Sequence, residues 1–79
     1  MTKYYFNIRA GERYIADQEG QEHTDLDEAK EEAMTAAREI LSEAVRFGEV
    51  IDGRRFEITD SEGNLCATVP FSEALRFQK

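Results

Sequence analysis

The sequence has very few of the side chains that small proteins use to form disulfides, bind metals or carry out catalysis. Its 79 residues include one cysteine and one histidine. A single cysteine excludes an internal disulfide and fits a reducing compartment. His23 has acidic neighbours, but no second histidine or cysteine joins it to complete a metal-ligand set. We therefore expect no metal ion and no cofactor.

Long apolar runs and an excess of basic charge are also missing. Residues 1–7 lack the apolar core and cleavage site of a signal peptide. No apolar run approaches the roughly 20 residues that a membrane-spanning helix needs. Ten Lys and Arg residues stand against 17 Asp and Glu residues, and the resulting net charge of −7 repels nucleic acid and anionic membranes at long range. We expect a soluble cytoplasmic protein with no membrane partner.

Residues arranged for catalysis are not apparent. Most carboxylates fall in turns or on the expected solvent side of a helix, where no dry cleft can shift their pKa values apart. Cys66 has no histidine in its own segment to act as a base. The acidic turn at residues 60–64 is too short for a calcium-binding loop, and no glycine-rich phosphate loop is present. We predict no catalytic residue and a protein that is not an enzyme.

Alternating segments at the two ends of the chain predict two β-hairpins. Residues 4–9 alternate, a turn with a glycine follows at 10–12, and residues 13–17 return as a second strand. The polar stretch 17–23 is interpreted as a loop.

The second hairpin consists of residues 55–60 and 65–70, joined by the turn at 60–64. Pro70 ends its last strand, because proline cannot donate a hydrogen bond to a central ladder. The inward-facing set of that strand is expected to be Leu65, Ala67 and Val69. Cys66 then lies on the outer face of the sheet.

Between the hairpins, residues 24–47 carry apolar side chains at steps of three and four, which is typical of an amphipathic helix. Thr24 with Asp27, or Asp25 with Glu28, resembles a capping box at its start. The apolar stripe consists of Leu26, Ala29, Ala33, Ala37, Ile40, Leu41 and Ala44. Four of these seven residues are alanines, so the helix backbone can lie close to a flat sheet.

These elements predict an α+β fold in one domain, residues 1–79. An antiparallel sheet of two β-hairpins has one long amphipathic helix across one face, in the order ββαββ. Gly48 ends that helix, and Ser72 caps a short C-terminal helical turn at residues 73–77. The strand order stays open: the hairpins meet within one chain, or they pair through edge strands in a dimer.

The alternation also predicts a basic, aromatic surface on the sheet face away from the helix. With Tyr4, Phe6 and Ile8 toward the helix, the opposite face gathers a set of candidate partner-binding residues. These are Lys3, Tyr5, Arg9, Arg13 and Arg55. Three interpretations stay open: charge pairing with Asp17 and Glu57, binding of an acidic protein segment, or base stacking and phosphate contacts with nucleic acid. The net charge favours protein over nucleic acid.

Several segments carry a resemblance to a known family. They include the opening strand at residues 3–9, the helix start at 25–29, an Asp-Gly-Arg-Arg segment at 52–55 and a Val-Pro-Phe segment at 69–71. With them, almost the whole chain resembles a family of short bacterial proteins of unknown function that are common in α-proteobacteria. The resemblance implies a cytoplasmic bacterial setting and carries no assigned activity.

The aromatic opening strand and the helix start at residues 26–29 are also similar, more weakly, to HicB-type antitoxin domains. That similarity implies an acidic module that binds a basic toxin or another small protein. We predict a non-enzymatic interaction or regulatory module that binds another protein or a second copy of itself. The alternative is a nucleic-acid-binding regulator that uses Arg9, Arg13 and Arg55.

Overall fold

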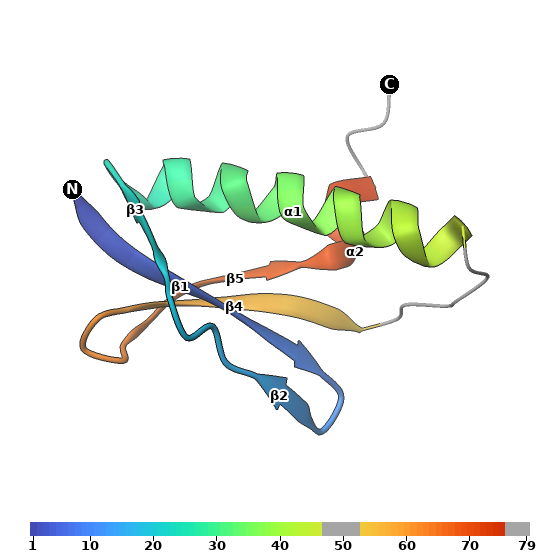
Figure 1. The fold of residues 1–79 in the computed structure, drawn as a ribbon, viewed down its shortest axis with the longest axis horizontal. Coiled ribbons are helices and arrows are strands. Elements are labelled where there is room, and N and C mark those ends of the chain that lie inside the picture. The colour runs from blue at the N-terminus through green and yellow to red at the C-terminus, as the bar shows by residue number, and fades with distance from the viewer. Residues whose placement is uncertain (47–52, 76–79) are drawn as a thin grey trace.

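A computed structural model describes the backbone of residues 1–46 and 53–75, and the side chains of residues 1–42 and 53–74. In this part of the chain, an antiparallel sheet forms one layer and two helices form the other (Figure 1). The strands are β1 (Thr2–Ala10), β2 (Arg13–Ile15), β3 (Gln21–His23), β4 (Arg54–Asp60) and β5 (Leu65–Pro70). The helices are α1 (Leu26–Arg46) and α2 (Phe71–Leu75). The predicted α+β class, with a helix across one face of an antiparallel sheet, is confirmed.

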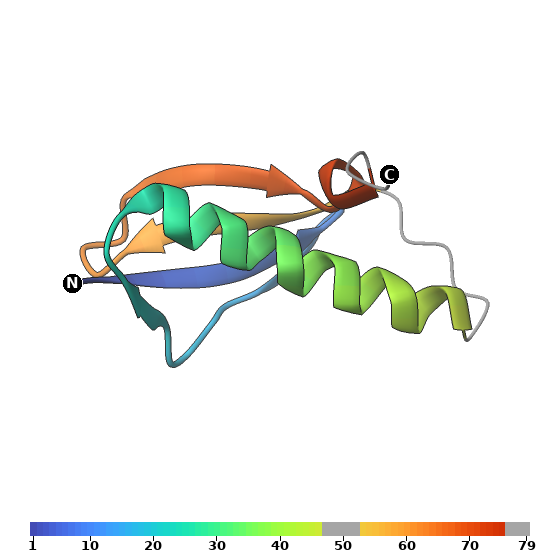
Figure 2. The same ribbon diagram turned by 90° about the horizontal axis from the view of Figure 1, so that it is seen from above.

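The two hairpins meet within one chain. The strand order is β2-β1-β4-β5, and β3 pairs with the other end of β1. β1 and β4 lie at the centre and pair over seven residues each, from Tyr4↔Asp60 to Ala10↔Arg54. Seen from above, α1 crosses this sheet diagonally, and α2 lies just beyond the end of β5 (Figure 2).

A capping box begins α1. The backbone N–H of Glu28 donates to Asp25 Oδ1 at 2.8 Å, and the backbone N–H of Thr24 donates to Glu28 Oε1 at 2.8 Å. The second of the two predicted pairings is therefore the one that forms, and the helix starts at Leu26. The first bond satisfies one of the N–H groups that a helix start leaves without partners, and the second ties the residue before the cap to the first turn. Gly48, the predicted stop, lies outside the described residues.

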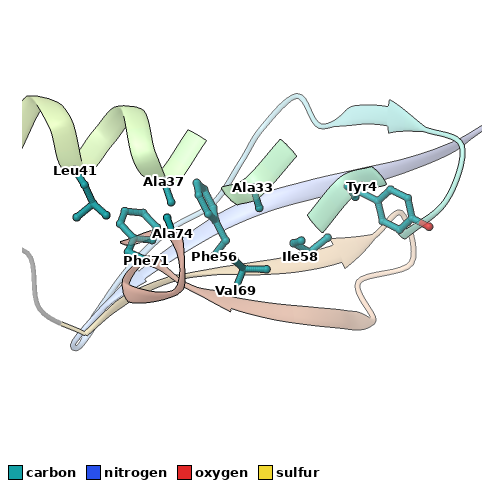
Figure 3. Close-up of a cluster of buried hydrophobic side chains, with 10 residues drawn as sticks. Tyr4, Ala33, Ala37, Leu41, Phe56, Ile58, Val69, Phe71 and Ala74 are labelled. Atoms are coloured by element: carbon teal, nitrogen blue, oxygen red, sulfur yellow. The ribbon is translucent and has the colours of Figure 1, made fainter. Parts of the chain in front are cut away.

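The core lies between α1 and the sheet, as the apolar stripe predicts. Ala29, Ala33 and Ala37 are fully buried, and Leu41 is nearly so. Figure 3 shows the helix side chains pointing at Ile58 and Phe56 of β4 and at Val69 of β5. The remaining described members of the stripe, Leu26 and Ile40, pack at its margin. The side chain of Ala44 lies outside the described residues.

The second helix begins earlier than the sequence predicts, at Phe71 rather than at residue 73. Phe71 is only 1% exposed, and its ring centroid lies 5.0 Å from that of Phe56. Ala74 is fully buried beside it (Figure 3). Phe71 is therefore part of the core and not the end of a strand; Phe77, placed in this turn by prediction, lies outside the described residues.

The predicted inward set of the last strand is wrong at its first position. The pairing of β4 with β5 shifts between Ile58 and Thr59, because Ile58 pairs with Ala67 while Thr59 pairs with Leu65. The extra residue, Cys66, packs against the core margin, and Leu65 turns outward with 60% of its surface exposed. A bulge of this kind reverses the alternation of side chains on one side of it.

The polar stretch 17–23, predicted as a loop, contains β3. Together, β2 and β3 make one interrupted edge strand along β1. At the interruption, the backbone N–H of Phe6 donates to Asp17 Oδ2 at 3.1 Å, and the backbone N–H of Asp17 donates to Asn7 Oδ1 at 2.9 Å. A side-chain carboxylate thus replaces a strand carbonyl as the acceptor for β1.

The chain packs closely over this interruption, and position 20 there requires a glycine. Its φ is +72°, a conformation that residues other than glycine rarely adopt. A Cβ atom there would lie 3.0 Å from Tyr5 Cε2 and 3.1 Å from the Tyr4 carbonyl oxygen. The segment between β2 and β3 therefore folds against the outer side of β1. Asn7, which lies beneath it, is only 4% exposed.

We predict that Asp17→Ala lowers the free energy of unfolding by about 1–3 kcal/mol, because the N–H of Phe6 loses its acceptor. Burial acts to raise the pKa of Asp17, but N–H donation from Phe6, Glu19 and Gly20 outweighs it and holds the pKa below its ordinary value. A lowered pKa gives stability that is present above the unfolded-state pKa and is lost as the pH falls through the folded-state value.

Urea denaturation of the parent and of Asp17→Ala, at neutral pH and in acid, measures both effects. The difference between the two proteins should shrink in acid, where the parent also loses its carboxylate. Glu19→Ala, which removes an exposed acid two residues away, is the matched control and should resemble the parent. A difference that stays constant across this pH range would contradict the role of the ionised carboxylate.

Candidate functional site

The candidate surface is the sheet face opposite α1, which no described helix covers (Figure 1). Tyr5, Asn7 and Arg9 of β1 lie on this face, beside their partners on β4. Side chains of directly paired residues point to the same side of an antiparallel sheet. The residues that share the face on β4 are Arg55, Glu57 and Thr59.

At one end of this face, two arginines share one carboxylate. Nε of Arg9 lies 3.3 Å from Oε2 of Glu57, and Nη2 of Arg55 lies 3.1 Å from the same oxygen. The side chains of Arg9 and Arg55 are 35% and 41% exposed, but that of Glu57 is only 15% exposed. The acid is therefore largely covered by two cations that stay open to solvent.

Tyr14 completes this group. Arg9 pairs with Tyr14 in the register of β1 and β2, and its guanidinium carbon lies 4.6 Å from the centre of the Tyr14 ring. An arginine at this distance from an aromatic face is attracted to it, and the contact holds the guanidinium in place. We call Arg9, Tyr14, Arg55 and Glu57 the arginine patch.

Arg13 does not belong to this surface, contrary to the prediction. It pairs with Ala10, which lies on the helix side of β1 together with Ile8. The turn has two residues, Gly11 and Glu12, and a two-residue hairpin loop fixes which residues pair. Counting the turn that way would have placed Tyr14, rather than Arg13, on the open face.

Lys3 and Tyr5 lie on the predicted face but toward the other end of β1. The ammonium nitrogen of Lys3 is 5.9 Å from the centre of the Tyr5 ring, and Lys3 pairs with Glu22 of β3. Tyr5 is half-buried because the segment around Gly20 packs against it. Arg9 lies four residues after Tyr5 along β1, a distance of about 13 Å. The predicted set is therefore divided into two parts.

The predicted charge pairing is found for one of the two acids. Glu57 pairs with the arginines, but Asp17 bonds to backbone N–H groups. Because one carboxylate meets two guanidinium groups, the arginine patch keeps one net positive charge.

The remaining chemically distinctive residues have structural partners. Nδ1 of His23 lies 3.1 Å from Oε1 of Glu28, and its ring packs edge-on against Phe6. The pKa of Glu28 lies below its ordinary value because the N–H of Thr24 donates to it and His23 lies beside it. Among the described residues, no three His, Cys, Asp or Glu side chains gather in a way that could hold a metal ion.

The environment of Cys66 does not activate its thiol. Burial raises the pKa of Cys66, and the negative charge of Asp60 raises it further. A reactive thiol needs the opposite, a neighbouring positive charge or base that lowers its pKa.

The fold and this surface define a small α+β domain with one open sheet face. The chain belongs to the DUF6894 family, a domain of unknown function, whose family model matches residues 3–72. No curated protein and no solved structure is detectably similar to it. Within the described residues, no helix has both the length and the apolar character that crossing a membrane requires.

Proposed function

We propose that the protein is a non-enzymatic interaction module that binds an acidic segment of another protein through the arginine patch. The observation that carries this proposal is that two half-exposed guanidinium groups are held side by side on an open sheet face. The expected setting is the bacterial cytoplasm. The weak similarity to HicB-type antitoxin domains also supports a protein-binding, regulatory role.

The geometry of the arginine patch suits a carboxylate ligand. The bonds to Glu57 use Nε of Arg9 and one terminal nitrogen of Arg55, so other N–H donors of both groups remain for a ligand. Arginine binds carboxylates through two parallel hydrogen bonds, which a lysine cannot do. Glu57 already restricts both side chains and Tyr14 also restricts that of Arg9, so binding costs less conformational entropy.

Charge also selects the partner. The whole chain carries a net charge of −7, but the arginine patch is locally positive. An acidic segment is repelled by the other surfaces and attracted to this one, so the field favours one docking position. Leu65 and Tyr14, both exposed, add apolar area on the same face.

We predict that Arg55→Glu weakens binding of acidic peptides by at least tenfold, because it turns the patch net negative and opposes Glu57 with a second carboxylate. An array of Glu- and Asp-rich peptides, followed by fluorescence anisotropy on those that bind, measures the effect. Arg38→Glu makes the same charge change at an exposed position on α1 and is the matched control. Equal losses for both variants would show that only total charge matters and would refute the site.

The second candidate function is a nucleic-acid-binding regulator. It is favoured by the two tyrosines that lie beside cations on the open sheet, since aromatic rings on a sheet face stack with bases. The net charge opposes it. Single-stranded DNA and RNA oligonucleotides form a further arm of the same titration: a nucleic-acid binder loses affinity steeply as salt rises, and no retention at low salt eliminates this function.

A further inference from the structure

The two edges of the sheet are very different. The β2–β3 edge is interrupted and carries charged residues, among them Arg13 and Glu22. β5, at the other edge, has no charged residue from Leu65 to Pro70 and continues without interruption after the bulge at Cys66. Natural proteins protect free edges with charges, breaks and bulges. From Ala67 to Val69, β5 has no charge, break or bulge, and no described strand pairs with its outer side, so this edge is open to another strand.

The hydrogen bonds of the sheet show which groups β5 presents. The N–H of Phe6 points away from β4, toward Asp17, so Phe6 and its partner Ile58 do not bond to each other. In an antiparallel sheet, such pairs alternate with bonded pairs. Ile58 therefore bonds to Ala67 of β5, and the next residue, Thr68, points its N–H and C=O outward.

Pro70 agrees with this assignment. It has the same orientation as Thr68, with its nitrogen on the free side of β5, where it has no intrachain bond to make. Proline is tolerated in edge strands in this orientation. The free edge thus offers the N–H and C=O of Thr68 near its centre and the C=O of Pro70 at its end.

A hollow of about 370 Å³ runs beside this edge on the helix side. Its walls include Met34 of α1 and Val69 of β5, with Lys30 and Glu73 also lining it. Figure 2 shows the first turns of α1 above the beginning of β5, and α2 beyond its end. The hollow therefore has an apolar lining, and opposite charges are supplied by α1 and α2.

We propose that β5 pairs antiparallel with β5 of a second copy of this chain, about a twofold axis at Thr68. A second copy suits this edge because the outward-facing Thr68 can lie on a twofold axis, where each Thr68 donates its N–H to the C=O of the other. Antiparallel pairing also brings α2 of one copy beside the first turns of α1 of the other, so Glu73 approaches Lys30 of opposite charge. The pairing uses the sheet edge and leaves the arginine patch free.

Sedimentation velocity over a range of concentrations, combined with amide hydrogen exchange of the same samples, tests this dimer. The mass should rise with concentration from 9.1 kDa toward twice that value. The Thr68 amide should exchange rapidly in the monomer and slowly in the dimer, because pairing buries it. A mass of one chain at every concentration, or a Thr68 amide that stays unprotected in a dimer, would overturn the proposal.

Two substitutions at the same position sharpen the test. Thr68→Pro removes the outward N–H without breaking a bond to any described residue, and it should weaken the dimer at least tenfold. Thr68→Val keeps the N–H and the β-branched shape, and it should dimerise like the parent. Circular dichroism checks that both variants fold. If Thr68→Pro does not fold, the exchange of the Thr68 amide in the parent protein tests the proposal instead. A dimer that survives Thr68→Pro unchanged would exclude pairing at this edge, whatever the outcome of the peptide titration.

Discussion

Replacing Ala33 with glutamate is expected to leave the protein unfolded. Ala33 lies on the side of α1 that faces the sheet and is fully buried. Glutamate there overfills the seam between helix and sheet and buries a carboxylate that has no partner, at a combined cost of roughly 5 kcal/mol or more. Whole domains are stabilised by only about 5–15 kcal/mol, and small ones fall toward the lower end.

Thermal denaturation followed by circular dichroism measures this result, and the variant should lack a cooperative transition. Thr35→Glu is the matched control, because it places the same side chain two residues away at an exposed position of the same helix. That variant should melt close to the parent, since surface substitutions change stability by about 0.5 kcal/mol or less. An Ala33→Glu variant that melts like the parent would show that this face of α1 does not pack on the sheet.

The architecture could be predicted because it follows from local periodicity. The three- and four-residue steps in α1 correctly identify the buried alanines Ala29, Ala33 and Ala37. The two-residue alternation in β1 and β4 correctly identifies the faces of Phe56 and Ile58. Each of these patterns repeats over several residues, so the burial of one position supports that of the next.

The wrong predictions fall where the regular alternation of a strand is interrupted by a side-chain hydrogen bond, a bulge or a tight turn. The edge strand continues as β3 after Asp17, because a side chain bonds to β1 across ten or eleven residues of chain. Leu65 faces outward because a bulge at Cys66 inserts one residue. Arg13 faces the helix side because the turn has two residues. A single residue of register decides each of these outcomes.

The two arginines of the candidate site could be predicted from the sequence, but how their neighbours hold them in place could not. Arg9 and Arg55 share a face because β1 and β4 follow strict alternation, although their direct pairing requires the register. Tyr14 was not predicted as part of the site, because the pairing of β2 with β1 was predicted one residue out of register. Glu57 was correctly proposed as a charge partner, but sequence could not show that it serves both arginines. Long side chains reach several neighbours, so alternation limits their partners without choosing among them.

Phe71→Ala is expected to lower the free energy of unfolding by about 3–5 kcal/mol, the usual cost of removing a buried phenylalanine ring. Phe71 joins α2 to the rest of the core, since its ring packs on Phe56 and Ala74 is buried beside it (Figure 3). The ring is also the largest fully buried side chain among the described residues. Its loss leaves a cavity between Phe56 and α2, a helix of five residues.

Urea denaturation gives the free energies, and Leu65→Ala is the matched control. It also truncates a large apolar side chain, but at a position where 60% of the surface is exposed. We expect Leu65→Ala to cost about 0.5 kcal/mol or less. A cost for Leu65→Ala equal to that for Phe71→Ala would mean that Leu65 is buried and that the bulge at Cys66 is absent. The alternation that the sequence predicts for β5 would then hold, and Leu65 would be lost from the open face, where it lies beside Thr59.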